Sequence, residues 1–336
     1  MAVLALGACR ATAHAKEAPN PITVGEPPVA DWASRFGRAH PLAGRLWQPA
    51  ARQFVQPAAL IAALAKAEFV LLGEKHDNAD HHRLQAWITR ALLAQGRKLA
   101  VAFEMFTADH APLIAKHLAK APRDGAGLGP ATGWSKRGWP RWRHYRPIAQ
   151  AALDTGLPII AADLSRATVM TIYGKGYGGL APDVVSRLGL GRPLPPAMRA
   201  AMTDDIFQSH CGYLPRDRTG SMVAVQRARD AHLARSVAKA LGAAGRLDGV
   251  ILVTGTGHAR RDRGVPMHLA HMAPGRSVVT LGLIEAGQGH NDPAAYGERF
   301  GAKAPPFDFV WFTARHDNAD PCQKFKKQLE GIEKKR

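Results

Sequence analysis

The sequence predicts an α/β fold in which a mainly parallel sheet is flanked by helices and interrupted by an inserted helical subdomain. Short apolar runs alternate with segments whose apolar residues recur at helical spacing, which is typical of parallel strands joined by helical crossovers. The strand pattern resumes after a long helical stretch. Charged and imidazole side chains follow several apolar runs, so polar chemistry is expected at the carboxyl ends of the strands.

The elements before the insertion alternate regularly. In order they are a strand over 68–72, a helix over 80–95, a strand over 98–103, a helix near 108–120, a Gly/Pro-rich break over 122–133, an aromatic and basic segment over 134–145, a helix over 147–155 and a strand over 157–162. Gly96 and Gly156 end two of these helices, as glycine commonly does. Three strands at 249–254, 277–284 and 308–312 complete the sheet.

Residues 164–245 form the predicted helical insertion, because this stretch contains no run that predicts a strand. We expect one domain over 31–325 that includes this insertion. Residues 1–30 are expected to be a lipoprotein signal remnant and tether, and 326–336 a basic tail.

The composition predicts a globular protein with anionic partners. Hydrophobic residues make up 46% of the chain, the net charge is +18 and the isoelectric point is about 10.3. Such a charge suits a carboxylate-bearing ligand, a membrane surface or nucleic acid. No nucleic-acid-binding motif accompanies the charge, so a nucleic-acid partner is not expected.

The N-terminal sequence Leu6-Gly7-Ala8-Cys9 is similar to a bacterial lipobox, which makes Cys9 the candidate lipidation site. No basic residue precedes it, so the start codon lies further upstream or the match is fortuitous. We expect an exported lipoprotein anchored to a membrane at its periplasmic face. Cys211 and Cys322 could pair in an oxidising compartment, although the sequence does not indicate that they meet.

Five polar residues lie at or just beyond predicted strand ends: Glu74, His76, Glu104, Asp163 and His258. Parallel strands bring such residues into one crevice. Carboxylates beside histidines can bind a divalent metal or exchange protons. The structural alternative is that these groups only satisfy one another and the surrounding loops.

Two further segments carry candidate chemistry. Aromatic and basic residues alternate from Trp134 to Tyr145, which suits stacking of a flat anionic ring, stacking of nucleobases, or packing on the sheet. Gln226, Arg229 and Asp230 share one face of a predicted helix that begins near Ser221. That face could line the crevice or face water.

Several motifs together resemble the ChaN-like haem-binding uptake lipoproteins, and the likeness extends from about residue 45 to 325. The matching residues are Leu72-Gly73-Glu74-Lys75-His76-Asp77-Asn78 with Asp80-His81-His82, Phe103-Glu104-Met105-Phe106, Trp142 with Tyr145, Ala161-Ala162-Asp163 with Arg166, His210-Cys211, Gln226-x-x-Arg229-Asp230 and Gly255-x-Gly257-His258-x-Arg260-x-Asp262-x-Gly264-Val265-Pro266.

This resemblance implies a non-catalytic haem carrier for iron uptake, with a possible haem receptor or transporter as its partner. It further implies a homodimer that buries haem, in which a tyrosine of one subunit holds the iron and basic and histidine side chains of the other grip the propionates. Tyr145 is the first candidate ligand, followed by Tyr213, Tyr177 and Tyr173. His210 and Arg143 are candidate haem contacts.

The wider Tiki and erythromycin-esterase-like superfamily, which the Gly-Glu-x-His motif also resembles, contains hydrolases. The alternative function is therefore a metal-dependent hydrolase in which Glu74, His76, Glu104 and His258 bind a divalent metal or act as a base toward water.

Overall fold

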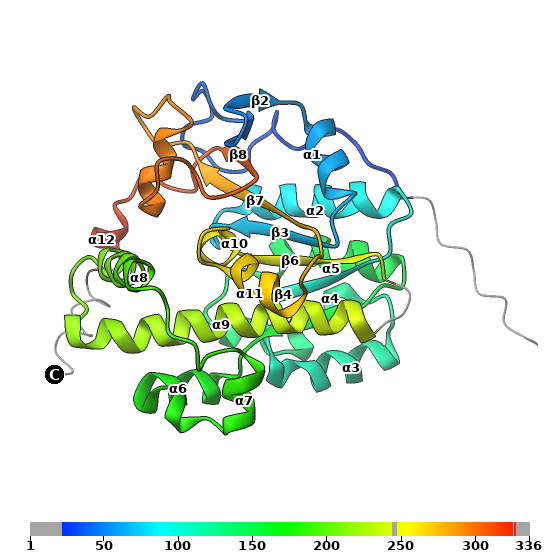
Figure 1. Cartoon of the computed structure of the whole chain (residues 1–336). Helices are drawn as coiled ribbons and strands as arrows, with labels where there is room; N and C mark the ends of the chain where they lie inside the picture. Colours follow the sequence, from blue (N-terminus) through cyan, green and yellow to red (C-terminus); the bar gives the residue numbers. More distant parts are fainter. Residues whose placement is uncertain (1–21, 244–246, 325, 327–336) are drawn as a thin grey trace, which may run out of the picture.

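The computed structural model describes residues 22–243, 247–324 and 326. Cys9, most of the predicted tether and most of the basic tail lie outside the described residues. The chain forms three layers, with helices on both faces of one sheet (Figure 1). Among the described residues, no helix combines the length and the hydropathy needed to cross a bilayer.

The sheet has eight strands in the order β2-β1-β8-β7-β3-β6-β4-β5. Their bounds are β1 Leu46–Gln48, β2 Gln53–Val55, β3 Phe69–Glu74, β4 Leu99–Thr107, β5 Ile159–Asp163, β6 Gly249–Gly255, β7 Val278–Glu285 and β8 Phe309–Thr313. The strands from β8 to β5 are parallel, which confirms the predicted fold class, whereas β1 pairs antiparallel with β8 and β2. The sequence did not predict β1 or β2, because three residues are too few to display a strand period.

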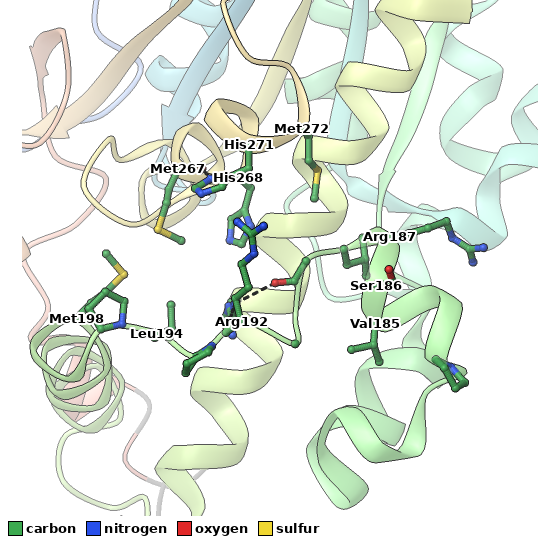
Figure 2. Close-up of a pocket in the computed structure, with 17 residues that line it drawn as sticks. Val185, Ser186, Arg187, Arg192, Leu194, Met198, Met267, His268, His271 and Met272 are labelled. Atoms are coloured by element: carbon green, nitrogen blue, oxygen red, sulfur yellow. Dashed lines mark hydrogen bonds between the residues drawn. The ribbon is translucent and has the colours of Figure 1, made fainter.

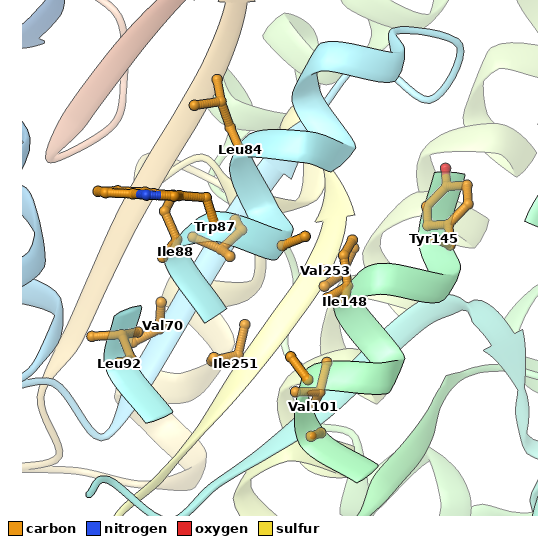
Figure 3. Close-up of a cluster of buried hydrophobic side chains, with 14 of the residues drawn as sticks. Val70, Leu84, Trp87, Ile88, Leu92, Val101, Tyr145, Ile148, Ile251 and Val253 are labelled. Atoms are coloured by element: carbon orange, nitrogen blue, oxygen red, sulfur yellow. The ribbon is translucent and has the colours of Figure 1, made fainter. Parts of the chain in front are cut away.

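One face of the sheet is covered by helices that follow the early strands. They are α1 Pro57–Leu64, α2 Ala79–Ala94, α3 Ala111–Lys120, α4 Gly125–Ala131 and α5 Trp142–Asp154, with the short 3₁₀ helices η1 Ala108–His110 and η2 Trp134–Lys136 between them. Figure 3 shows Leu84 and Ile88 of α2 and Ile148 of α5 against Val70 and Val253 of the strands. Asn78 caps α2, since its side-chain oxygen accepts the amide hydrogens of residues 80 and 81.

The other face is covered by α9 Arg216–Ala243, α10 Thr256–Ala259 and α11 Val265–Met272. Leu233 and Val237 of α9 pack on the sheet with Leu269 of α11. The first half of α9 extends past the sheet and carries the smaller helices of the predicted insertion (Figure 1). These helices are α6 Arg166–Lys175, η3 Gly176–Gly179, α7 Pro182–Arg187 and α8 Pro196–Ser209.

The end of the described chain is tied to this lobe. Cys211 and Cys322 form a disulfide with Cα atoms 5.7 Å apart, joining the turn after α8 to α12 Pro321–Lys324. A 3₁₀ helix, η4 Ala295–Phe300, lies between β7 and β8. At the other end, the indole nitrogen of Trp87 donates to the carbonyl oxygen of Gly25 at 2.7 Å, so part of the predicted tether packs on α2.

Candidate functional site

Four adjacent strands bring the predicted polar residues together. Glu74 ends β3, Glu104 lies in β4, Asp163 ends β5 and His258 lies in α10, directly after β6. Because β6 enters the sheet between β3 and β4, the carboxyl ends of all four strands open onto one crevice. The pairing of β4 with β5 is irregular between Phe103 and Thr107, next to Glu104.

Glu74 lies at the centre of one half of the crevice and is buried. Nδ1 of His76 lies 2.9 Å from its Oε1, and Nδ1 of His82 lies 2.6 Å from its Oε2. The hydroxyl of Tyr145 donates to Oε1 at 2.8 Å. Nε2 of His82 also donates to the carbonyl of His76 at 2.9 Å. Burial opposes protonation of His82, but the charge of Glu74 outweighs burial and raises the pKa of His82.

Glu104 and Asp163 share one guanidinium. Nη2 of Arg229 lies 2.8 Å from Oε1 of Glu104 and 2.6 Å from Oδ2 of Asp163. The other oxygen of Glu104 accepts from the Thr254 hydroxyl at 2.6 Å and the Gly255 amide at 2.7 Å. Helix α9 is thereby fixed to β4, β5 and β6 at the strand ends.

His258 connects the two acidic groups of the second half. Its Nδ1 lies 2.6 Å from Oδ1 of Asp230, and its Nε2 lies 3.5 Å from Oε1 of Glu104. Gln226 lies 3.1 Å from Nδ1 of His258. The stripe of Gln226, Arg229 and Asp230 therefore faces the crevice. The sequence alone did not decide whether this stripe faces the crevice or water.

The electrostatics favour the charged forms of Glu74, His76 and His258, whereas burial raises the pKa of Asp230. Burial opposes ionisation of Glu74, but His82 and His76 outweigh it and lower its pKa to about 2. Burial also opposes protonation of His258, but Glu104 and Asp230 raise its pKa to about 10. The pKa of His76 is raised in the same way, with burial outweighed by Glu74 and Glu104.

This charge state does not suit a divalent metal. A metal needs deprotonated imidazoles and free carboxylate oxygens. Here Arg229 occupies both Glu104 and Asp163, and His258 lies between Glu104 and Asp230 with its pKa raised to about 10. In the described part of the chain, the one group with metal-like spacing is a different one, Asp77 with His316 and Asp317, within 4.8 Å. Lys324 lies 2.7 Å from Asp317 and 3.5 Å from Asp77.

The crevice is reached from two sides. The side chain of His76 is 35% exposed and lies edge-on to Trp139, with ring centroids 5.0 Å apart. A small cavity of about 210 Å³ beside α8 is lined by Gln226, Asp230 and Gly257. The crevice thus offers an exposed imidazole and one small cavity.

The candidate tyrosines have very different surroundings. Tyr145 is completely buried, and its pKa is raised well above the usual value by burial and by Glu74. Its hydroxyl is therefore not accessible to an outside ligand, and Tyr145 is no longer the first candidate for the iron ligand. The hydroxyl of Tyr177 donates to the carbonyl of Ala224 at 3.0 Å. Within the described residues, the half-buried Tyr173 and Tyr213 make no side-chain hydrogen bond.

Tyr213 and His210 lie in the turn that follows α8. Nδ1 of His210 donates to the carbonyl of Ile206 at 2.7 Å, which leaves the lone pair on its Nε2. The turn needs Gly212, whose φ of 76° is unfavourable for other residues, and it is anchored by the Cys211 disulfide. A tyrosine and a histidine are thus presented on a fixed turn.

Arg143 is exposed on α5 and not in the crevice. It lines a separate surface groove of about 690 Å³ with His144 and Arg90. Sequence reasoning missed His82 as a partner of Glu74. The available signal was its place in the first turn of α2, just after the cap Asn78, from which its ring reaches Glu74 at the end of β3.

Comparison with known proteins gives the following matches. The family described as haem-binding uptake, Tiki superfamily, ChaN, matches residues 60–269. Among solved structures, ChaN of Campylobacter jejuni, described as binding haem cofacially, is 21% identical with a TM-score of 0.57, covering 79% of this chain and 95% of that one. No curated protein matches the sequence.

Two weaker structural matches are the type III effector HopBA1 and a mutant of the erythromycin esterase EreC in its open conformation. HopBA1 is 14% identical with a TM-score of 0.41, covering 76% of this chain and 91% of that one. EreC is 12% identical with a TM-score of 0.38, covering 86% and 87%.

Proposed function

We propose a function from the premise that this chain belongs to the ChaN-like family of haem-binding uptake proteins in the Tiki superfamily. The protein binds haem as an exported, membrane-anchored carrier of iron uptake and does no chemistry on it. The observation that carries the assignment to this chain is the disulfide-anchored turn at 210–213, where a tyrosine hydroxyl has no hydrogen-bond partner among the described residues.

Tyr213 is the proposed iron ligand. A phenolate suits ferric iron, and only a tyrosine that can lose its proton can supply one. The hydroxyl of Tyr145 donates a hydrogen bond to Glu74 deep in the crevice, and the hydroxyl of Tyr177 donates a hydrogen bond to a backbone carbonyl. Tyr173 packs within the small apolar cluster of α6 and α9. Tyr213 has neither constraint and lies beside His210.

A second copy of the chain is proposed to complete the site. One tyrosine leaves the other face of a haem open, and the Campylobacter relative is described as binding haem cofacially. The exposed guanidinium of Arg216, over the ring of Phe207 at 4.3 Å, is available for a propionate. His210 presents its free Nε2 on the same turn.

Export and anchoring rest on two observations. The Cys211–Cys322 disulfide is typical of oxidising compartments. The lipobox-like sequence before Cys9 supplies the proposed anchor. The metal-dependent hydrolase is not proposed, because the carboxylates of the crevice are already paired with cations.

The test is a haemin titration of the full chain and of single Tyr→Phe variants, followed by absorbance. Tyr213→Phe is expected to lose the ferric tyrosinate bands and at least about tenfold in affinity. Tyr173→Phe is the matched control and keeps both. If Tyr213→Phe binds haemin with an unchanged spectrum, the ligand assignment is wrong.

A further inference from the structure

A large cavity lies away from the crevice. Its volume is about 820 Å³, and it lies between α7, the loop over 188–195, α8, α9 and α11 (Figure 2). This volume lies within the range of small-molecule sites. Neither Tyr213 nor any of the sheet-end carboxylates contributes to its wall.

The wall is basic. It includes Arg187, Arg192, Arg227, His268 and His271 but no aspartate or glutamate. Arg187 is paired with Asp183, which lies outside the wall. Arg192 makes no ion pair or side-chain hydrogen bond within the described residues, although its side chain lines the cavity (Figure 2).

Arg227 is a buried cation without a carboxylate partner in the part of the chain that the structure describes. It is 8% exposed, and its terminal nitrogens donate to the carbonyl oxygens of Gly189, Leu190 and Arg192. Its Nε has no hydrogen-bond partner. Buried charges are normally paired, because dipoles alone compensate them incompletely. Among the described residues, the loop is thus folded around a guanidinium that has no carboxylate partner and lies 6.0 Å from the ring of Tyr177.

The neighbouring His268 has a lowered pKa. His268 is buried, and its pKa is lowered to about 4 by burial, with Arg227 and His271 acting in the same direction. Its Nε2 also has no hydrogen-bond partner. Two residues of the cavity wall, Arg227 and His268, therefore each hold a buried nitrogen without a hydrogen-bond partner among the described residues.

The remaining wall is apolar and adaptable. Val185, Leu194, Met198, Met267 and Met272 line it. In Figure 2, Met198 of α8 and Met267 of α11 lie near one another, and both pack on the same small apolar cluster. Methionine side chains adjust to irregular apolar shapes. The cavity therefore combines an apolar body site with a basic end.

We propose that this cavity binds an amphipathic carboxylate, with Arg192 contacting the carboxylate, Arg227 supplying the uncompensated positive field and the methionines enclosing the apolar body. The apolar body is either an aliphatic chain or a porphyrin. A fatty acid and a porphyrin both bear a carboxylate, so Arg192 would contact either ligand in the same way. This site is separate from the proposed haem site at Tyr213.

The test measures binding of dodecanoate to the full chain by calorimetry, with dodecyltrimethylammonium as the control of equal tail length. Saturable binding of dodecanoate at one per chain is expected, at least about tenfold tighter than the ammonium. Equal binding of the two amphiphiles overturns the proposal. Iron-free protoporphyrin is the second arm. Displacement of dodecanoate by this porphyrin assigns the carboxylate to a porphyrin, and binding of dodecanoate alone assigns it to an aliphatic chain.

Two variants locate the site. Arg192→Gln is expected to weaken binding about tenfold, whereas Arg187→Gln, a rim arginine already paired with an acid, changes it less than about twofold. Gly191→Phe adds a bulky ring at the cavity wall, where a Cβ meets no atom within 4 Å, and should weaken binding at least about tenfold. Equal effects of the two arginine variants, or full binding by Gly191→Phe, contradict the assignment. The Arg192→Gln variant should still bind haemin at Tyr213 with unchanged affinity. A failure of the cavity proposal is therefore distinguishable from a failure of the haem assignment.

Discussion

Replacing Arg229 with methionine is the sharpest test of the crevice as a charge-paired structure. The substitution keeps the aliphatic stem and removes a guanidinium that bonds to two buried carboxylates. Glu104 keeps the Thr254 hydroxyl and the Gly255 amide, but Asp163 keeps only the amide of Leu164 among the described residues. Removing one partner of a buried ion pair costs about 3–5 kcal/mol, so we expect a loss of about 4 kcal/mol, mostly through Asp163.

The assay is urea unfolding at neutral pH, in which the midpoint falls while the slope stays unchanged. Arg235→Met is the matched control, because Arg235 lies on the same helix and makes no ion pair within the described residues. It should cost less than about 1 kcal/mol. Arg229→Lys keeps the charge without the fork and should cost an intermediate amount. A loss below about 1 kcal/mol for Arg229→Met, or an equal loss for Arg235→Met, would refute the reasoning.

Two further predictions concern stability. The raised pKa of His258, about 10, means that the stability from its proton is present below pH 6.5 and is lost as the pH rises through 10. The loss is on the order of 5 kcal/mol in urea unfolding, and a pH profile unchanged by His258→Asn would contradict it. Gly73→Ala should cost about 1–3 kcal/mol, because its Cβ would lie 2.9 Å from that of Ala259 and 3.2 Å from the carbonyl of Leu281. Gly257→Ala, where a Cβ meets nothing within 4 Å, is its control and should unfold at nearly the same urea concentration as the unaltered chain.

The parallel sheet could be predicted because its strands are continuous apolar runs in the sequence. Strands that are buried on both faces of a sheet need such runs. The runs at 68–72 and 249–254 correspond to β3 and β6, whose residues are completely or almost completely buried. The sequence predicted a helix that starts at Pro147, because proline is common in the first turn of a helix. Helix α5 instead begins at Trp142, and Pro147 lies inside it. The strand predicted over 98–103 was too short as well, because β4 continues to Thr107.

The site was predicted as far as local sequence determines it. Glu74, Glu104 and Asp163 could be placed together because strand ends converge, but Arg229 could not, because the facing of its helix depends on tertiary packing. The burial of Tyr145 did leave a signal. Tyr145 shares a helical face with Ile148, Ala149 and Ala152 at i, i+3, i+4, i+7 spacing, and all four are buried.

The central claim is that this chain binds haem as a carrier. The most direct measurement is a haemin titration of the unaltered full chain with absorbance and molecular mass recorded together. The account predicts a saturable Soret shift at one haem per chain, with a change from monomer to dimer as haem is added. A featureless, non-saturating response without a change in mass would contradict it.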